Sequence, residues 1–375
     1  MNILLCFNDK FVSLARILII SLMCHHEELH IYVGYFDLNE ANRQGLKELV
    51  EGSLSGANLP WDNGDYAKKH AKRSIDFVHF DSKSLGSIVS SDVSRWSLDT
   101  WTRCFIWEQI PVDRLLYLDA DMIVKANIEQ FYYDDLQGKP LKACPDSTCY
   151  DNTFWKHRHI ERFQQTHGFA NGPSSPYVNA GVMLFDLKTM REEGDSAVKF
   201  LDFISKLKAP LEFNDQDFLN LYYDGRIKMG DPYKYNCMVP PLSQVPRRFL
   251  SPLKNVTFSE MPYPRSEADC PVSHQGTTYD PARIRIIHYS CVNKPHQAFY
   301  RHKFANIFWH YALMDPLDTS KHRWLQIFQN IYYYLRNLVP DYPKRTWYLL
   351  TNGAEIAKNN QLAANSVDVT DPDNN

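Results

Sequence analysis

The sequence predicts an α/β fold with a mostly parallel sheet flanked by helices, and three observations support this. Short apolar runs alternate with segments of helical periodicity along the first third of the chain, which is the pattern of repeated strand–helix–strand units. The run NILLCF at residues 2–7 is almost entirely apolar, as expected of a strand buried on both faces. Polar residues follow a later run, at the edge where open parallel sheets bind ligands.

The expected elements follow in chain order. Strands are predicted at residues 2–7, 29–36, 74–80 and 114–124, and helices at residues 12–25, 39–51 and 100–110. Asn39 is the expected N-cap of the second helix, because its side-chain oxygen can accept a hydrogen bond from an unpaired backbone amide. Pro111 is expected to end the third helix, since proline cannot continue the helical hydrogen-bond ladder.

The rest of the chain divides by composition into a main domain at 1–312, a helical extension at 313–350 and a tail at 351–375. Residues 52–74 lack a steady apolar period and predict a surface insertion. Residues 232–281 carry many prolines and predict long loops. The tail is rich in Asn, Ala and Asp, and we expect it to be disordered.

Residues 324–339 have the pattern of an amphipathic helix, with apolar residues at spacings of four and three. Two interpretations stay open. The helix docks on the core or on a second subunit, or it lies on a membrane surface beside Lys344 and Arg345. The polar face is mostly Gln and Asn, which favours docking on protein.

The composition excludes several classes of protein. The chain has 375 residues, 44% of them hydrophobic and 23% charged, with a net charge of -3, which does not fit a general nucleic-acid binder. The apolar run ILIISLM is too short to span a bilayer, and the start becomes polar at Asn8, unlike a secretory signal. The eight cysteines include no Cys-x-x-Cys pair, so we expect reduced thiols and a cytoplasmic location.

Asp119 and Asp121 carry the most specific chemistry, because they interrupt the apolar run RLLYLDADMIV. Residues two apart on a strand project to the same side, so both carboxylates are expected together at the sheet edge. Two carboxylates this close repel, and a divalent cation such as Mg²⁺ or Mn²⁺ removes the conflict. An Asp-rich turn after a strand is the alternative interpretation.

Other polar residues occur in similar places. Asn179 lies near the start of an apolar run, and Gln216 lies at the start of a helical pattern that Asn214 or Asp215 could cap. His288 ends the apolar run before Lys294. A histidine can complete a metal site and a lysine can bind a phosphate. Taken singly, His288 can also be an ordinary buried histidine, and Lys294 a solvated surface charge.

Four motifs in this order, LDAD, VNAGVMLFDL, NDQDFLN and HYSCVNKP, resemble those of the family 8 retaining glycosyltransferases. This family includes bacterial lipopolysaccharide galactosyl- and glucosyltransferases and, more distantly, glycogenin. The likeness runs from residue 2 to about residue 310. It implies a GT-A fold, a UDP-sugar donor, and a glycan, glycolipid or glycoprotein acceptor.

The resemblance also implies roles for individual residues. Asp119, Asp121 and His288 match the metal ligands, usually of Mn²⁺ and alternatively of Mg²⁺, which bridges the donor diphosphate. Lys294 matches a lysine that binds the same diphosphate.

The donor sugar is expected to lie against a second group of residues. Arg103 matches an arginine near the donor, Asn179 matches a residue that contacts the sugar, and Asp215 and Gln216 match residues that flank the anomeric carbon. Asp146 resembles a residue that contacts the sugar or the acceptor.

Four positions depart from the family pattern. Asn8 replaces the usual Asp and Phe11 the usual Tyr at the nucleotide base; Phe11 can still stack on a ring, and Asn8 can still form hydrogen bonds. Cys291 replaces Gly and His296 replaces Trp in the last motif.

The resemblance therefore implies a retaining, metal-dependent hexosyltransferase, and our hypothesis for its mechanism is same-face attack. Two rivals stay open. One is a metal-dependent nucleotidyl- or phosphoryltransferase, which the lack of a Walker-type glycine-rich loop disfavours. The other is a non-catalytic glycan-binding protein on the same fold, which the complete set of metal ligands disfavours.

Overall fold

The computed structural model describes residues 1–51, 72–81, 99–146, 157–167, 176–238, 283–290, 294–295, 305–312 and 314–315. Several sequence predictions lie outside these residues: most of the 52–74 insertion, the 324–339 helix, the 351–375 tail and the substitutions at Cys291 and His296.

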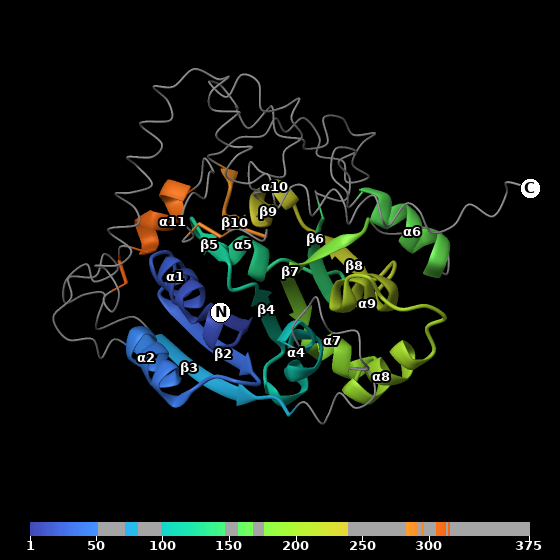
Figure 1. Ribbon diagram of the computed structural model, residues 1–375, viewed down its shortest axis with the longest axis horizontal. Helices are drawn as coiled ribbons and strands as arrows, with labels where there is room; N and C mark the ends of the chain where they lie inside the picture. Colours follow the sequence, from blue (N-terminus) through green and yellow to red (C-terminus); the bar gives the residue numbers. More distant parts are fainter. Residues whose placement is uncertain are drawn as a thin grey trace, which may run out of the picture.

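A seven-stranded sheet organises the molecule, with strand order β3-β2-β1-β4-β7-β6-β8 (Figure 1). Its strands are β1 (Asn2–Cys6), β2 (Glu28–Tyr35), β3 (Lys72–His79), β4 (Arg114–Leu118), β6 (Leu141–Pro145), β7 (Val178–Asp186) and β8 (Ile227–Met229). All neighbouring pairs are parallel except those of β7, which runs antiparallel to β4 and β6. The predicted mostly parallel sheet is confirmed.

The two faces of the sheet bury separate apolar cores, which follows from the alternation of side chains along a strand. In β1, Ile3 and Leu5 belong to one core, and Leu4 belongs to the other. All three are fully buried. A strand buried on both faces has no polar side to display, and this explains the continuous apolar run at residues 2–7.

Helices cover both faces (Figure 1). The first core receives side chains from α1 (Val12–Met23), α2 (Glu40–Glu51) and α11 (Ala305–Ala312). The second receives them from α4 (Asp99–Phe105), α7 (Leu187–Glu192), α8 (Ala197–Ser205) and α9 (Asn214–Tyr222). Asn39 accepts a hydrogen bond from the backbone amide of Asn42 at 2.8 Å, so the predicted cap of α2 is confirmed.

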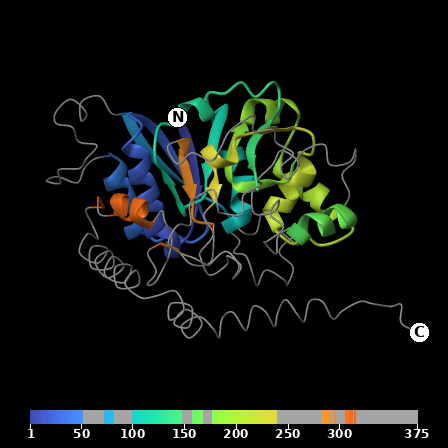
Figure 2. The ribbon, with the colours of Figure 1, turned by 90° about the horizontal axis from the view of Figure 1, so that it is seen from above.

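The stretch 114–124 is not one strand, as the sequence predicted, but two strands of different sheets. After β4 the chain turns at Asp119–Asp121, and β5 (Met122–Val124) joins β10 (Ile286–His288) and β9 (Cys237–Met238) in a second sheet. Figure 1 places this small sheet beside α1, and Figure 2 shows β9 and β10 side by side. The two aspartates therefore occupy a turn at which the chain changes sheets.

Other boundaries also differ from the prediction. The third helix is α-helical only to Phe105 and continues as a 3-10 helix, η3 (Ile106–Gln109), before Pro111. The start of the predicted 232–281 loop region contains α10 (Pro232–Tyr235) and β9. The remaining elements are η1 (Asp9–Phe11), α5 (Glu129–Tyr132) and α6 (His157–His167). Within the described part of the chain, no helix has both the length and the apolar character that crossing a bilayer requires.

Candidate active site

Three strands of the large sheet bring polar residues to one edge. Asp119 follows β4 and Asp146 follows β6, while Asn179 is the second residue of β7. Because β7 is antiparallel to both neighbours, its first residues lie beside the carboxyl ends of β4 and β6. Here the backbone amide of Asp119 donates to the carbonyl of Gly181 at 2.9 Å.

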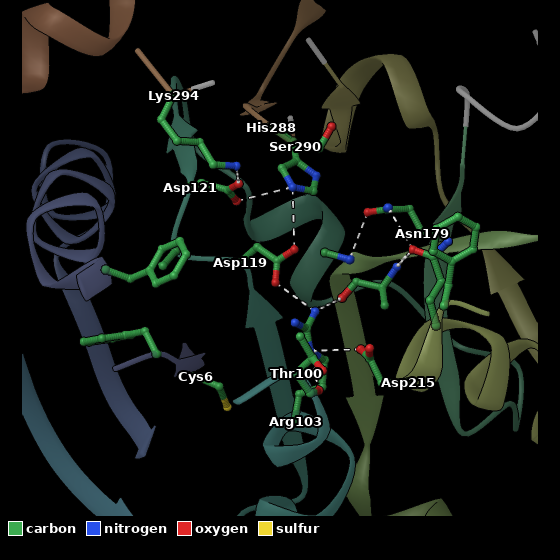
Figure 3. A pocket seen from close by; sticks show the side chains of 17 residues that line it. Cys6, Thr100, Arg103, Asp119, Asp121, Asn179, Asp215, His288, Ser290 and Lys294 are labelled. Atoms are coloured by element: carbon green, nitrogen blue, oxygen red, sulfur yellow. Dashed lines mark hydrogen bonds and ion pairs between the residues drawn. The ribbon is translucent and has the colours of Figure 1, made fainter. Parts of the chain in front are cut away.

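A cavity of about 450 Å³ opens at this edge, within the roughly 300–1,000 Å³ of typical small-molecule sites. Figure 3 shows its polar side chains converging from α4, the turn after β4, β7, α9, β10 and the segment that follows β10. Most of the sequence-predicted site residues line it: Phe11, Arg103, Asp119, Asp121, Asn179, Asp215, Gln216, His288 and Lys294.

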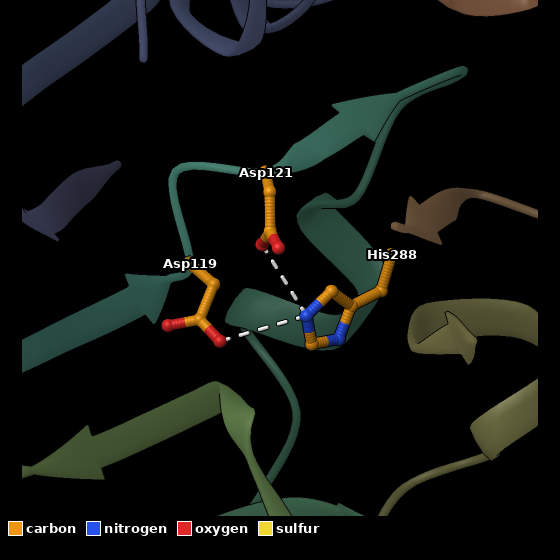
Figure 4. A group of neighbouring side chains, drawn as sticks. All are labelled: Asp119, Asp121 and His288. Carbon is orange, nitrogen blue, oxygen red and sulfur yellow. Dashed lines mark ion pairs between the residues drawn. The ribbon is translucent and has the colours of Figure 1, made fainter. Parts of the chain in front are cut away.

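Asp119, Asp121 and His288 form a compact cluster (Figure 4). The Nε2 atom of His288 lies 3.5 Å from Oδ2 of Asp119 and 3.3 Å from Oδ1 of Asp121. One ligand atom from each side chain lies within 4.8 Å of the other two. The pairing of β5 with β10 places His288 opposite Met122, next to Asp121.

The ligand atoms of this cluster fit a divalent cation. Two carboxylate oxygens and an imidazole nitrogen suit Mn²⁺ or Mg²⁺, and a cation relieves the repulsion between the carboxylates. Two hydrogen bonds fix the orientation of the Asp119 carboxylate, since its Oδ1 accepts from Arg103 at 2.8 Å and from Tyr117 at 2.6 Å. This leaves Oδ2 of Asp119 turned toward His288.

Arg103 links two parts of the site. Its Nη1 also donates to the carbonyl of Ala180 at 2.9 Å, and its Nε lies 3.2 Å from Oδ2 of Asp215. The guanidinium stands 4.5 Å from the centre of the Tyr117 ring. Arg103 is only 8% exposed, so in this structure its charge is shared between the two carboxylates of Asp119 and Asp215.

Lys294 forms an ion pair with Asp121 and donates to the carbonyl of Tyr289 at 2.8 Å. Burial alone would raise the pKa of Asp121, but the charges of Lys294 and His288 lower that pKa well below its usual range. Asp121 is therefore ionised at neutral pH, as a metal ligand must be.

Asp215 and Gln216 begin α9 and face the cavity. Burial raises the pKa of Asp215 to about 6, with Arg103 opposing the rise and Asp119 adding to it. The predicted capping of this helix by Asn214 or Asp215 is wrong. Asp217 instead accepts hydrogen bonds from the backbone amides of Glu212 and Phe213, both at 2.8 Å, so Asp217 is engaged in holding the segment before α9.

Asn179, Gln216 and Asp146 form one hydrogen-bonded group. The Asn179 amide donates to Gln216 Oε1 at 3.0 Å and to Asp146 at 3.3 Å, and Gln216 Nε2 donates to Asp146 at 3.2 Å. Asp146 is fully buried, and it is not among the residues that line the cavity, whereas Asn179 and Gln216 are. The expected contact of Asp146 with sugar or acceptor stays a prediction.

Asn8 and Phe11 follow β1, and only Phe11 is among the residues that line the cavity. The Asn8 side chain accepts a hydrogen bond from the backbone amide of Lys10 at 3.0 Å and caps η1. Phe11 is 39% exposed and lines the cavity, so its ring is open to stacking.

A sequence model of glycosyl transferase family 8 matches residues 2–298. The chain belongs to this family. The match covers the large sheet, the cavity and all three residues of the candidate metal cluster.

Two curated relatives of this family 8 protein carry glycosyltransferase names. The chain is 22% identical over 231 residues to a putative glycosyltransferase of Haemophilus influenzae, covering 61% of each chain. It is 25% identical over 225 residues to glycosyltransferase GlyB of Streptococcus pneumoniae, covering 59% of this chain and 44% of the relative. The chain thus spans less than two thirds of the length of these relatives.

Solved structures show the GT-A fold. The galactosyltransferase LgtC in complex with donor and acceptor sugar analogs is 19% identical, with a TM-score of 0.57 over 83% of this chain and 95% of that chain. The bifunctional glycosyltransferase WbbM has a TM-score of 0.60 at 18% identity, over 86% of this chain and 51% of that chain. The expected fold and family are confirmed.

The family that the chain matches is one of glycosyltransferases. This membership favours sugar transfer over the two rival functions that the sequence left open, nucleotidyl or phosphoryl transfer and non-catalytic glycan binding.

Sequence reasoning missed two residues of the site. Tyr117 orients Asp119 from within β4, and Asn236 connects His288 with Asn179. Tyr117 lies two residues before Asp119, on the same side of the strand, and that spacing is a usable signal. Asn236 lies in a region expected to be loop, and its contacts come from distant segments.

Proposed function

We propose that this family 8 glycosyltransferase transfers a hexose, glucose or galactose, from a UDP-sugar to a glycan, glycolipid or glycoprotein acceptor with retention of configuration. The observation that carries the proposal is the meeting of Asp119, Asp121 and His288 with Lys294 in one cavity. Such a group suits a diphosphate better than a neutral ligand.

The donor diphosphate is the proposed ligand of this end of the cavity. A Mn²⁺ or Mg²⁺ ion held by Asp119, Asp121 and His288 would supply positive charge to the departing diphosphate. Lys294 adds a second positive charge within reach of the same oxygens. Phe11 offers a face for the uracil ring at the open side of the cavity.

The sugar is proposed to lie against Asn179, Asp215 and Gln216. As the glycosidic bond breaks, the sugar acquires oxocarbenium character. The Asp215 carboxylate stabilises that positive charge, and the Gln216 carboxamide orients the sugar because its own orientation is set by the backbone amide of Ala180 at 3.1 Å.

Retention is proposed to arise by attack on the face from which UDP leaves. Gln216 is a weak nucleophile, and Asp215 is engaged by Arg103. The acceptor hydroxyl approaches beside the departing phosphate and gives it its proton, so no covalent sugar–enzyme adduct forms. A glycosyl adduct trapped on Asp215 of the otherwise intact enzyme would contradict this route.

A donor screen tests the proposed function. The enzyme is incubated with Mn²⁺ and, separately, UDP-glucose, UDP-galactose, UDP-N-acetylglucosamine and UDP-N-acetylgalactosamine, and UDP release is measured. We expect slow UDP release from one of the two simple hexose donors, and its loss on addition of a chelator. Metal-independent release would contradict the proposal, as would release from neither simple hexose donor.

We further propose a cytoplasmic enzyme whose 324–339 segment docks on the core or on a second subunit, or contacts the inner face of the membrane. Flotation with anionic vesicles, set against sedimentation without lipid, separates these alternatives. Flotation indicates the membrane and a dimer indicates the second subunit, whereas a monomer that does not float contradicts both of these and leaves docking on the core.

A further inference from the structure

Two backbone amides of β7 set the orientation of the polar side chains behind the metal cluster. The amide of Ala180 donates to Gln216 Oε1 at 3.1 Å, and the amide of Gly181 donates to Asn179 Oδ1 at 2.9 Å. A backbone amide can only donate, so the facing side-chain atom must be an oxygen in both cases. The orientation of the Asn179 carboxamide is thereby fixed.

The orientation of Asn236 follows from that of Asn179. Its Nδ2 lies 2.9 Å from Oδ1 of Asn179, and because that atom is an acceptor, the amino group of Asn236 must face it. The carbonyl oxygen of Asn236 then points the other way, where it lies 2.8 Å from Nδ1 of His288. An amide oxygen accepts only, so Nδ1 of His288 carries the hydrogen.

The hydrogen on Nδ1 leaves Nε2 as the ring nitrogen that can bind a metal. Whenever the imidazole is neutral, its lone pair lies on Nε2, which stands 3.5 and 3.3 Å from carboxylate oxygens of Asp119 and Asp121. Nε2 of His288 and one carboxylate oxygen each of Asp119 and Asp121 can then all offer lone pairs to one cation.

The fold holds this arrangement rigidly. Asn236 is 1% exposed and His288 is 2% exposed, so water has little access to replace either hydrogen bond. Asn236 lies between α10 and β9, and β9 pairs with β10 so that Met238 lies opposite His288. Asp231 caps α10 through the amides of Tyr233 and Lys234, which fixes the path of the chain into Asn236.

We propose that Asn236 is a positioning residue that sets the tautomer of His288 and so prepares Nε2 as a metal ligand. The inference rests on the proposed function, since it assumes that the cluster binds a metal. It also makes Asn236 the connection between the proposed sugar contact, Asn179, and the metal ligand His288.

The first test reads the tautomer directly in the metal-free wild-type enzyme. Nitrogen NMR of ring-labelled histidine, recorded at a pH high enough that the His288 imidazole is neutral, distinguishes a protonated from an unprotonated imidazole nitrogen, and a His288→Gln sample assigns the signal. We expect the hydrogen on Nδ1. A hydrogen on Nε2 alone would overturn the proposal, and this outcome does not depend on the folding of any Asn236 variant.

The second test measures Mn²⁺ affinity by electron paramagnetic resonance titration in the absence of any UDP-sugar. Asn236→Leu should weaken Mn²⁺ binding by roughly 10- to 100-fold, the usual effect of losing a group that orients a ligand. Asn236→Asp keeps an acceptor for Nδ1 but loses the donor to Oδ1 of Asn179, so its Mn²⁺ affinity should fall less than that of Asn236→Leu. Asn220→Leu is the control, since Asn220 is a similarly buried amide that bonds Val178 and the backbone carbonyl of Gln216 but not His288.

The outcomes separate the two claims. Unchanged Mn²⁺ affinity in a folded Asn236→Leu enzyme would overturn the role of Asn236, as would an equal loss in Asn220→Leu. Absence of Mn²⁺ binding by the wild-type enzyme would overturn the proposed function instead, and the NMR measurement would still decide the tautomer of His288.

Discussion

Lys294 pairs with Asp121 through the carboxylate oxygen that faces away from His288. The lysine contacts Oδ2, while Oδ1 lies 3.3 Å from the imidazole. The two oxygens of one carboxylate are thus divided between the lysine and the candidate metal position. Lys294 neutralises Asp121 in this arrangement, and it lies where it can bind a phosphate once a cation occupies the cluster.

Replacing Lys294 by Met should change metal and nucleotide binding in opposite directions. Without the ammonium group, the cluster is more negative and should bind Mn²⁺ more tightly, whereas UDP loses a charged hydrogen bond. A charged hydrogen bond contributes about 1.5–3 kcal/mol, so UDP affinity should fall by about tenfold or more. Calorimetry with each ligand measures both effects. Lys188→Met, an exposed site on α7, is the control, and equal UDP affinities in the two variants would contradict the role of Lys294.

Gly181→Ala should disrupt the metal cluster by contact alone. A Cβ at this position would lie 2.5 Å from Cε1 of His288 and 2.9 Å from Oδ2 of Asp119, so both ligands must move. We expect Mn²⁺ affinity to fall by about tenfold or more. Gly34→Ala crowds Cys6 and Thr102 instead and should lower thermal stability while retaining Mn²⁺ affinity. Normal Mn²⁺ binding by the Gly181 variant would show that the cluster is not the metal site.

Asp215 should set the acid limb of the pH–rate profile. Burial raises its pKa to about 6, and the proposed mechanism requires the carboxylate, so kcat should fall as the pH falls through about 6. Arg103 opposes the rise in this pKa, and Arg103→Met should therefore move the acid limb to higher pH. Asp202→Asn, on an exposed part of α8, should leave the profile unchanged. An acid limb that stays in place when Arg103 is replaced would contradict this assignment.

Much of the site could be predicted from local sequence, because its residues follow or begin apolar runs. Asp119, Asn179 and His288 each lie at a strand end, and the order of strands in the sheet then brings them together. The change of sheet after Asp119 could not be predicted, since β5 pairs with β10, which lies far along the chain. Local patterns do not encode such partners.

The same limit explains what was wrong or missed around the site. Asn236 acquires its role from the pairing of β9 with β10, and nothing in the adjacent residues indicates it. In the sequence, nothing distinguishes Asp217 from the other acidic residue in the first turn of α9, Asp215. The role of Asp217 depends on His159 of α6 and on Tyr177, the residue before β7, which both bond to it.

His159 should make stability depend on pH. Burial opposes its charge, but Asp217 and Glu212, each 2.9 Å from a ring nitrogen, raise the pKa of His159. A raised folded-state pKa means that the stabilisation is fully present below about pH 6.5, the ordinary histidine value, and is lost as the pH rises through the raised pKa.

Urea denaturation of wild type and His159→Gln at pH 6 and pH 9 measures this contribution. His159→Gln should cost roughly 3–5 kcal/mol at pH 6, the usual effect of breaking a buried ion pair, and less at pH 9. His167→Gln, at the C-terminal end of α6, is the control. An equal loss at both pH values would exclude the protonated form of His159 as the stabilising species.

The central claim is that Asp119, Asp121 and His288 hold the metal that helps UDP to leave. The most direct measurement compares wild type with Asp121→Ala for two properties, Mn²⁺-dependent UDP binding and UDP release from the donor that wild type prefers. We predict that the variant loses the Mn²⁺ dependence of UDP binding and that its turnover falls by at least about 100-fold, the scale on which metal catalysis acts. Unchanged Mn²⁺-dependent binding together with unchanged turnover would contradict the account.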